Sequence, residues 1–589
     1  MLTMERKASN LNSLWANLII EELLRNQINY FCLSPGSRST LLASAVAVNK
    51  RAHSLMHLDE RGTAYYALGY ARATGRPAVL ISTSGTAVAN YMPAVVEASM
   101  DMVPMILLTA DRPPELRQSF ANQTVDQVKI FGDYVRWQFD LPCPDENIPS
   151  EFVLTTIDQA IYRSIRTPAG PVHLNCMFRE PLVPEDPIED RGMYSSHVRS
   201  WCKSEQPYTR YESAPGFIDA DQLTELASAL NDTRSGLLIV GGLKNEVERQ
   251  SVLCLSEKLG WPALPDISSG LRLGPKCENI IPYYEHILSH GLAISIKGPM
   301  VLHVGGRLTS KRLLKFLESS PLEGYIMVAD HPFRHDPIHR VTTRIEVDIA
   351  HLCESLLPLL SHGQDHEFLE GFKTATRVVD EVLEDLIGSD TPFSEPACAR
   401  LISKYISGDT GLFLASSMPI RDMDMFADVK GPAVPVACNR GASGIDGTIA
   451  SAAGFATGLR RPVTLLIGDL AFLHDLNSLA MLKSLSHPLV IVVINNNGGG
   501  IFSFLPIAEH KAIFEPYFST PHNLTFENAA RMFGFDYHAP ETTDSFVLCY
   551  QSAQSKGRST IIEVKSDRSE NYKIHQAIHQ RIVAALDSL

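Results

Sequence analysis

Short apolar runs alternate with helical patterns along the first third of the chain. The runs lie at residues 30–34, 78–82, 105–110 and 171–176, and each is bounded by Gly, Pro or Ser. Runs of this length are typical of buried parallel strands, and apolar residues between them recur at helical spacing. The pattern therefore predicts a parallel α/β domain over residues 1–190.

Two further blocks repeat this alternation. Residues 236–242 and 301–306 each predict a strand that ends in a glycine pair, within a middle Rossmann-like domain at 215–365. Apolar runs at 412–415, 463–467, 489–494 and 561–564 predict the strands of a third domain at 385–589. We expect an α/β fold of three doubly wound parallel-sheet domains, with ligands at the carboxyl ends of the strands. The Pro- and Ser-rich stretch 184–216 predicts a linker.

Composition narrows the class of protein. A chain of 589 residues exceeds the size at which one core stops growing, so two or three domains are expected. The net charge of −14 argues against a general partner among nucleic acids or anionic membranes. No apolar run reaches the ~18 residues that span a bilayer, and the N-terminus does not have the pattern of a signal peptide. We expect a cytoplasmic protein without stable membrane insertion.

Several histidine and glycine patterns offer weaker alternatives. His331, His335 and His339 recur at helical spacing, but Pro332 and Pro337 interrupt the helix that a metal face would need. His575 and His579 lack the Glu of a zinc-protease motif, so they predict an exposed helix face. The glycine pairs lack G-x-G-x-x-G, which argues against a nicotinamide dehydrogenase.

The most specific chemistry lies after two strands of the third block. Gly468 and Asp469 follow one apolar run, and residues 495–500 (NNNGGG) follow the next. Magnesium requires oxygen ligands in near-octahedral geometry, and the Asp469 carboxylate, the Asn496 amide and the Gly498 carbonyl could supply them beside a diphosphate. Gly468 would let the backbone approach the phosphate. Each piece alone predicts a helix cap or a turn; together they resemble the motif of thiamine-diphosphate enzymes.

A thiamine coenzyme also needs a carboxyl group at its aminopyrimidine ring. Glu60, in HLDER at residues 57–61, lies between an apolar run and a helical pattern. A buried glutamate hydrogen-bonded to a ring nitrogen favours the tautomer that removes the reactive proton. Alone, Glu60 would be interpreted as a helix cap. Ile445, in NRGASGIDG at 439–447, is either an apolar wedge beneath the coenzyme or an ordinary core residue.

Several segments together resemble one family, the 2-succinyl-5-enolpyruvyl-6-hydroxy-3-cyclohexene-1-carboxylate synthases (MenD family). The resemblance covers almost the whole chain. Its segments are SPGSRST (34–40), DER (59–61), TSGTA (83–87), TADRPPEL (109–116), NQT (122–124), SSMPIRD (416–422), NRGASGIDG (439–447), GDLAFLHDL (468–476) and NNNGGGIFSF (495–504). The diphosphate motif contains G-D-L instead of the common G-D-G, and this synthase family also has a non-glycine residue there.

The resemblance implies a reaction, cofactors and an assembly. The family decarboxylates 2-oxoglutarate and adds the remaining carbanion in a 1,4 sense to isochorismate, on the way to menaquinone or phylloquinone. The implied cofactors are thiamine diphosphate and Mg²⁺, with Mn²⁺ as a possible substitute. The implied assembly is a homodimer or a dimer of dimers, with active sites at the subunit interface.

The resemblance also implies roles for individual residues. Both substrates carry two carboxylates, which guanidinium groups bind in bidentate fashion. The implied catalytic residues are Glu60, Arg38, Arg112, Gln123, Arg421 and Arg440. The implied substrate-binding residues are Ser37, Arg38, Arg112, Asn122, Gln123, Lys311, Arg312, Ser417, Arg421 and Arg440. The implied cofactor-binding residues are Glu60, Gly441, Ser443, Ile445, Gly468, Asp469, Leu470, Asn496, Ile501 and Phe502, and the metal ligands are Asp469, Asn496 and Gly498.

Two alternatives remain at this point. One is another thiamine-dependent 2-oxo acid carboligase of the acetolactate-synthase type, which would consume pyruvate without 2-oxoglutarate. The other is a cofactor-binding protein without turnover, against which the presence of Glu60, Asp469 and Asn496 argues.

Overall fold

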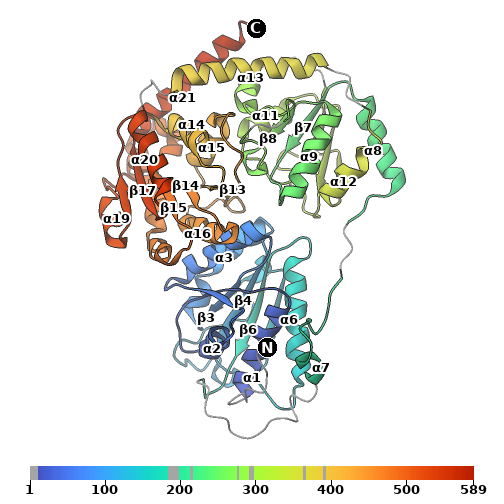
Figure 1. Ribbon diagram of the computed structural model, residues 1–589, viewed down its shortest axis with the longest axis vertical. Helices are drawn as coiled ribbons and strands as arrows, with labels where there is room; N and C mark the ends of the chain where they lie inside the picture. Colours follow the sequence, from blue (N-terminus) through green and yellow to red (C-terminus); the bar gives the residue numbers. More distant parts are fainter. Residues whose placement is uncertain are drawn as a thin grey trace. The chain divides into compact units, whose positions relative to one another are not determined.

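The protein contains three parallel β-sheets, each with helices packed against it (Figure 1). The computed structural model describes residues 11–182, 198–212, 216–274, 277–290, 298–361, 366–388 and 393–589. The strand orders are β2-β1-β3-β4-β6-β5, β11-β10-β9-β7-β8 and β13-β12-β14-β15-β17-β16. The predicted α/β class with three parallel-sheet domains is confirmed.

The first sheet contains all four strands that the apolar runs predict, and two more. Its strands are β1 (Tyr30–Leu33), β2 (His53–Met56), β3 (Val79–Ser82), β4 (Met105–Asp111), β5 (Trp137–Leu141) and β6 (Pro171–Met177). Its main helices are α1 (Leu11–Arg25), α2 (Thr40–Val48), α3 (Glu60–Thr74), α5 (Met92–Met100) and α6 (Ser150–Ile165). The two strands without a predicted run, β2 and β5, are edge strands, and most of their residues are exposed or half-buried. An edge strand needs no continuous apolar run.

The middle sheet includes both strands predicted with glycine pairs. Its strands are β7 (Gly236–Val240), β8 (Ala263–Pro265), β9 (Met300–Val304), β10 (Gly324–Ala329) and β11 (Thr343–Glu346). Its helices include α8 (Ala220–Asp232), α9 (Glu246–Leu259), α10 (Tyr284–His290), α11 (Lys311–Ser319) and α12 (Ile349–Leu356), and α13 (His366–Ile387) follows them. Residues 331–339 form no helix, as their prolines predict.

The third sheet has the same strand order as the first. Its strands are β12 (Gly411–Leu414), β13 (Val436–Cys438), β14 (Val463–Gly468), β15 (Leu489–Asn495), β16 (Asp536–His538) and β17 (Thr560–Lys565). Its helices include α14 (Glu395–Tyr405), α15 (Met418–Phe426), α16 (Thr448–Leu459), α17 (Asp469–His474), α19 (Glu527–Phe533), α20 (Thr543–Ser555) and α21 (Arg568–Leu586). None of the described helices is long and apolar enough to cross a bilayer.

The chain divides into two compact units whose boundaries do not follow the sequence order. Unit 1 comprises residues 1–213, 439–460 and 474–486, and unit 2 comprises the remainder. Within unit 1, α16 packs closely against α3, because a Cβ atom on Gly454 or Gly69 would lie 1.9 Å from a backbone oxygen of the other helix. This division into two units does not test the three domain ranges expected from the sequence, which stay a prediction.

Part of the predicted linker packs into unit 1. Residues 199–202 form the short helix α7 (Arg199–Cys202), and Trp201 is buried against the Arg25 guanidinium. The Trp201 indole donates a hydrogen bond to Glu22 at 2.6 Å. The linker prediction is therefore wrong for this helix, because one large aromatic residue suffices to anchor a polar segment. Residues 184–197 and 213–215 of the predicted linker lie outside the described residues.

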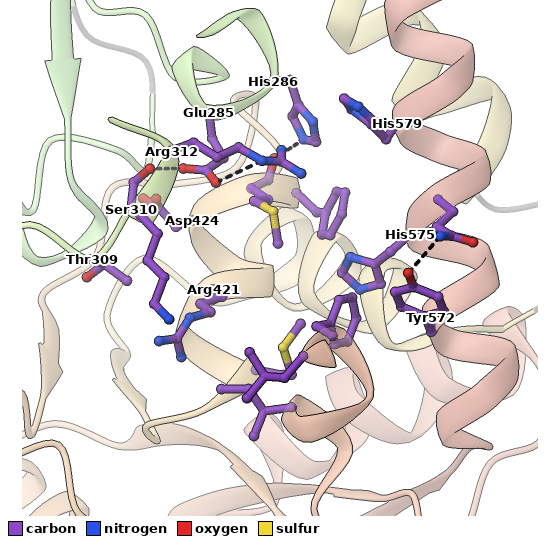
Figure 2. A pocket seen from close by; sticks show the side chains of 18 of the residues that line it. Glu285, His286, Thr309, Ser310, Arg312, Arg421, Asp424, Tyr572, His575 and His579 are labelled. Carbon is purple, nitrogen blue, oxygen red and sulfur yellow. Dashed lines mark hydrogen bonds and ion pairs between the residues drawn. The ribbon is translucent and has the colours of Figure 1, made fainter. Parts of the chain in front are cut away.

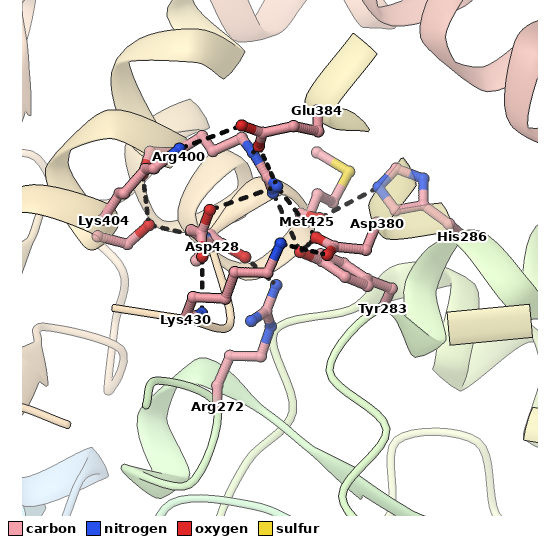
Figure 3. Close-up of polar contacts among 12 residues, drawn as sticks. Arg272, Tyr283, His286, Asp380, Glu384, Arg400, Lys404, Met425, Asp428 and Lys430 are labelled. Atoms are coloured by element: carbon pink, nitrogen blue, oxygen red, sulfur yellow. Dashed lines mark hydrogen bonds and ion pairs between the residues drawn. The ribbon is translucent and has the colours of Figure 1, made fainter. Parts of the chain in front are cut away.

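A buried ion cluster connects the third sheet's helices with the middle part of unit 2 (Figure 3). The Arg400 guanidinium on α14 lies 3.0 Å from Asp380, 2.8 Å from Glu384 and 3.3 Å from Asp428, and donates to the Tyr283 hydroxyl at 3.0 Å. Burial alone would lower the pKa of Arg400, but Tyr283 and the acidic neighbours raise it above its usual range. The cluster fixes α13, α14 and the loop after α15 to one another.

Candidate active site

The two loops predicted to hold a cation meet at the edge of the third sheet. Asp469 lies at the carboxyl end of β14 and is 2% exposed. Its Oδ2 accepts the Gly498 N–H at 2.9 Å, and His522 Nε2 lies 3.1 Å away. Its Oδ1 accepts the Leu470 N–H at 2.7 Å, so Asp469 also begins α17 and binds a backbone N–H there, in line with the helix-cap interpretation.

Asn496 presents one unpaired oxygen in the same loop. Its Nδ2 donates to Glu395 Oε1 at 3.0 Å, whereas its Oδ1 is buried and has no hydrogen-bond partner among the described residues. Gly498 follows with a φ of +134°, and a Cβ there would lie 2.0 Å from Ser519 O. A non-glycine residue would therefore displace this turn.

These donors fit a hard divalent cation. A buried carboxylate, an amide oxygen without a partner and a backbone carbonyl beside them are the ligand types that Mg²⁺ selects. No group of three or more His, Cys, Asp or Glu side chains placed to hold a metal occurs in the described part of the chain. The predicted site would not produce such a cluster. It has only one carboxylate, and its other ligands would be amide, backbone and diphosphate oxygens.

Unit 2 also contains a cavity of about 390 Å³ that brings five predicted residues together (Figure 2). Lys311 and Arg312 reach it from the start of α11, and Arg421 reaches it from α15. Ile501 and Phe502, from the loop after β15, form part of its apolar wall. Ser417, whose φ is +77°, accepts a hydrogen bond from Arg421 through its carbonyl oxygen.

Neutral histidines surround the cations of this cavity. Burial, and then the nearby Arg312 charge, lower the pKa of His286 and of His575 to about 3. The His575 ring lies edge-on to Phe426 and Phe504, at centroid distances of 5.1 Å and 5.0 Å. The predicted exposed face is therefore wrong for His575, whose side chain is 9% exposed. A lysine and arginines among apolar and neutral groups suit a ligand with carboxylates and an apolar body.

Glu285 and Ser310 hold Arg312 at the rim of the cavity. Glu285 Oε1 lies 3.6 Å from Arg312 Nε, and the Ser310 hydroxyl donates to Glu285. Burial raises the pKa of Glu285, and the Arg312 charge opposes that rise. No local sequence pattern signals Glu285, because its role depends on two elements that are distant in the chain.

In unit 1, Glu60 lies where the sequence places it, at the junction of a strand and a helix. Asp59 caps α3 by accepting the N–H groups of Arg61 and Gly62, and Glu60 is the first residue of that helix. Asp59 therefore performs the capping that the alternative interpretation assigned to Glu60. Glu60 is half-buried, and its Oε2 is 3.4 Å from Asn90 Nδ2.

Two predicted arginines of unit 1 lie close together at the end of the first sheet. Burial and the charge of Arg38 lower the pKa of Arg112. Arg38 donates to Phe178 O at 3.1 Å, and Arg112 donates to Gln123 O at 3.1 Å and to the Ser84 hydroxyl. Arg38 also lies 3.4 Å from the exposed Glu180 carboxylate. Two neighbouring guanidinium groups, one of them paired with this exposed acid, favour a bound anion. Ser37 and Asn122 are exposed in the loops after β1 and β4.

The predicted loop 439–447 is organised by two acidic side chains of unit 1. Glu97 accepts the N–H groups of Gly441 and Ala442 at 2.7 Å and 2.6 Å, and Asp446 accepts the Tyr65 hydroxyl. Ser443 and Ile445 are at least partly exposed in this loop, and Arg440 is half-buried. Ile445 is 38% exposed, so it is not the ordinary core residue of the second interpretation.

The structure thus gathers the predicted residues in two groups. Lys311, Arg312, Ser417, Arg421, Gly468, Asp469, Leu470, Asn496, Gly498, Ile501 and Phe502 belong to unit 2, and the others belong to unit 1. The meeting of Glu60 and Asp469 on one coenzyme stays a prediction. Residues missed from the sequence, among them Glu97, Glu285 and Glu395, are buried acids that hold the predicted residues in place.

Family models of thiamine enzymes match most of the chain. The N-terminal thiamine-pyrophosphate-binding domain matches residues 15–130, the middle domain matches 192–414 and the C-terminal thiamine-pyrophosphate-binding domain matches 429–564. A crystal structure of benzoylformate decarboxylase from Polynucleobacter necessarius has the same fold, with a TM-score of 0.72 at 15% identity over 94% of this chain and 98% of that one.

Curated relatives extend over nearly the full length. A protein of Rubrobacter xylanophilus named 2-succinyl-5-enolpyruvyl-6-hydroxy-3-cyclohexene-1-carboxylate synthase is 52% identical over 568 residues, which cover 96% of this chain and 98% of the relative. A protein of Salinibacter ruber with the same name is 44% identical over 583 residues, which cover 98% of both.

Proposed function

We propose, from the premise that this chain belongs to the 2-succinyl-5-enolpyruvyl-6-hydroxy-3-cyclohexene-1-carboxylate synthase family of thiamine-diphosphate enzymes, that its predicted residues perform that family's reaction. The substrates are 2-oxoglutarate, which loses carbon dioxide, and isochorismate, which receives the remaining four-carbon unit. The acetolactate-type alternative is disfavoured by relatives of a different name over the whole chain.

The arrangement around Asp469 carries this proposal. Its carboxylate accepts a hydrogen bond from the Gly498 N–H. The same loop carries the Asn496 side-chain oxygen, which is buried and has no hydrogen-bond partner among the described residues. In the proposed site, Asp469, Asn496 and the Gly498 carbonyl hold Mg²⁺, which binds the coenzyme's diphosphate; Mn²⁺ is the expected substitute. Leu470 and Gly468 would lie beside the same diphosphate.

Glu60 is the proposed proton-holding group at the other end of the coenzyme. When bound, thiamine diphosphate supplies a carbon nucleophile and an electron sink. Glu60 hydrogen-bonds the aminopyrimidine nitrogen and holds a proton there. Ile445 supports the bent coenzyme, and this role is consistent with its exposed side chain on a loop that Glu97 fixes.

The basic side chains bind the carboxylates of the two substrates in this proposal. The cavity of unit 2 is largely apolar, its histidines are neutral, and three basic side chains line it: Lys311, Arg312 and Arg421. An anion bound there would meet these positive charges. The acidic side chains in the lining are Glu285 and Asp424. Arg38, Arg112, Gln123 and Arg440 contribute from unit 1, with Ser37, Asn122 and Ser417 as hydrogen-bonding groups.

The proposed assembly is a homodimer or a dimer of dimers in the cytoplasm, in which Glu60 of one subunit and Asp469 of the other act on one coenzyme. Analytical sedimentation of the active enzyme, with activity assayed in each fraction, tests this assembly. Activity that sediments with the monomer contradicts it.

The reaction is tested with purified protein, Mg²⁺ and thiamine diphosphate. We expect isochorismate to disappear and carbon dioxide to form when 2-oxoglutarate is also present. Omission of 2-oxoglutarate is the control. Pyruvate consumption with no requirement for 2-oxoglutarate would instead favour the acetolactate-type reaction, and coenzyme binding without turnover of any of these substrates would favour a binding protein.

A further inference from the structure

Glu395 is a buried acid beside the proposed cation ligands, and it is not itself one of those ligands. It is the first residue of α14 and is 3% exposed. Its Oε1 accepts two hydrogen bonds, from Asn496 Nδ2 at 3.0 Å and from the Ser566 hydroxyl at 2.7 Å. Burial raises its pKa, and the charge of Asp469 adds to that rise. An acid in such a place needs a reason, because burial of a carboxyl group is costly.

The backbone of the Asn496 loop is already fixed without Glu395. Arg568 donates to the carbonyl oxygens of Asn496 and Asn497, and the Ser566 N–H donates to Asn495 O at 3.0 Å. What these contacts leave undetermined is the final torsion of the Asn496 side chain. A half-turn about that torsion exchanges its oxygen and its nitrogen.

The exchange decides whether Asn496 can bind a cation. With Nδ2 toward Glu395, the buried Oδ1 remains without a partner among the described residues and can donate a lone pair. With the amide reversed, two oxygens would face each other at about hydrogen-bond distance, and an N–H group would face the cation. Both bonds go to Oε1, so a single oxygen of Glu395 accepts from Asn496 and from Ser566.

We propose that Glu395 is a positioning residue that fixes the Asn496 amide with its oxygen toward the divalent cation. This inference rests on the proposed function, because it assumes the Asp469–Asn496 cation site. Groups that orient metal ligands from behind typically change metal affinity roughly 10- to 100-fold when they are removed.

The first test measures Mg²⁺ affinity of the full-length protein at saturating thiamine diphosphate by titration calorimetry. Glu395→Leu removes the acceptor at similar volume, and we expect the Mg²⁺ dissociation constant to rise roughly 10- to 100-fold. Glu395→Gln keeps a carbonyl oxygen and should retain most of the affinity. Ser566→Ala removes the other hydrogen bond to Oε1 and is the matched control, with near-normal affinity expected.

A second test exchanges the hydrogen-bond donor and acceptor between Asn496 and Glu395. It separates orientation of the residue 496 side chain from a general contribution of Glu395 to folding. Asn496→Asp places a carboxylate against Glu395 and should weaken Mg²⁺ binding. Adding Glu395→Gln supplies an N–H donor to one oxygen of the introduced aspartate, which leaves its other oxygen for the cation, so affinity should recover. Recovery supports the proposal also where Glu395→Leu alone does not fold.

The failures of the two proposals are distinguishable. If the wild-type protein binds neither Mg²⁺ nor thiamine diphosphate, the proposed function fails and this inference fails with it. If the wild-type protein binds both and Glu395→Leu binds Mg²⁺ equally well, the orienting role alone is overturned. Absence of recovery in the Asn496→Asp, Glu395→Gln double variant overturns it as well.

Discussion

The first and third sheets have the same strand order, but the ends of two corresponding strands, β4 and β15, differ in how far their polar side chains find partners. At the end of β4, Asp111 accepts hydrogen bonds from the Arg112 N–H at 2.7 Å and from Asn175 Nδ2 at 3.0 Å. After β15, the corresponding loop leaves the Asn496 oxygen buried without a partner among the described residues. A buried polar atom without a partner is costly, and the proposed cation would be the partner of the Asn496 oxygen.

The side chains at the carboxyl ends of the two sheets also differ in charge. The first sheet ends in Arg38 and Arg112, close enough for one to lower the pKa of the other, which suits an anion. The third sheet ends in Asp469 and Asn496, which suits a cation. One topology would therefore support ligands of opposite charge in the proposed sites, because the strands position the loops and the loop side chains determine the chemistry.

Replacement of Glu60 by Gln should give the largest effect, because it removes a proton-holding group while keeping the shape. Positioned acids and bases contribute roughly 10²- to 10⁴-fold to turnover, so kcat should fall by that factor. Steady-state kinetics measures the loss, and calorimetry should show thiamine diphosphate binding near the wild-type level. Near-normal turnover would refute the role of Glu60.

Replacement of Asp469 by Ala should weaken Mg²⁺ and thiamine diphosphate together. The loss of one partner of a buried charged contact costs roughly 2–5 kcal/mol, and both affinities should fall accordingly in calorimetric titrations. Asp111→Asn, at the end of β4 in the first sheet, is the matched control and should leave Mg²⁺ affinity unchanged. Equal losses in the two variants would contradict the contrast between the sheets.

Replacement of Arg112 by Lys keeps the charge but removes the planar guanidinium. The KM for one dicarboxylate substrate should rise, with a cost of roughly 1.5–3 kcal/mol for a lost charged hydrogen bond. Mg²⁺ affinity should stay constant, since the proposed cation ligands all lie in unit 2. Initial-rate measurements at varied substrate separate these effects, and an altered Mg²⁺ requirement with unchanged KM would argue against an anion site at the first sheet.

Replacement of His575 by Phe should give the smallest effect, on acid stability. The pKa of His575 is lowered from 6.5 to about 3, so the unfolded chain takes up a proton first as the pH falls. The contribution of neutral His575 to stability is therefore present above pH 6.5 and is lost progressively between pH 6.5 and about 3.

The His575→Phe variant should lose that part of the pH dependence, at most about 1.4 kcal/mol per pH unit. Urea unfolding at a series of pH values measures the slope. His53→Phe, at an exposed position on β2, is the control with no expected change. An identical slope in the His575→Phe variant and the wild type would show that His575 is not buried as a neutral group.

Local patterns were sufficient for much of the fold. The apolar runs predicted the buried central strands, since a strand covered on both faces needs continuous apolar residues. They did not predict β2 and β5, whose edge positions leave most of their residues partly exposed. The local pattern also placed residues 199–202 in a linker, because burial of Trp201 depends on α1, which is distant in the sequence.

Asp469, Asn496 and Glu60 could be predicted as site residues from the sequence alone, because each follows a strand within a recognisable motif and its proposed role depends on its own side-chain chemistry. Glu395, Glu97, Glu285 and His575 could not, because a buried acid or histidine acquires its role from partners distant in the chain, such as Asn496 for Glu395. Local residue order specifies which groups end each strand. Long-range packing decides whether the oxygen or the nitrogen of an amide faces outward and which histidine stays neutral, because burial and hydrogen-bond partners exist only in the folded chain.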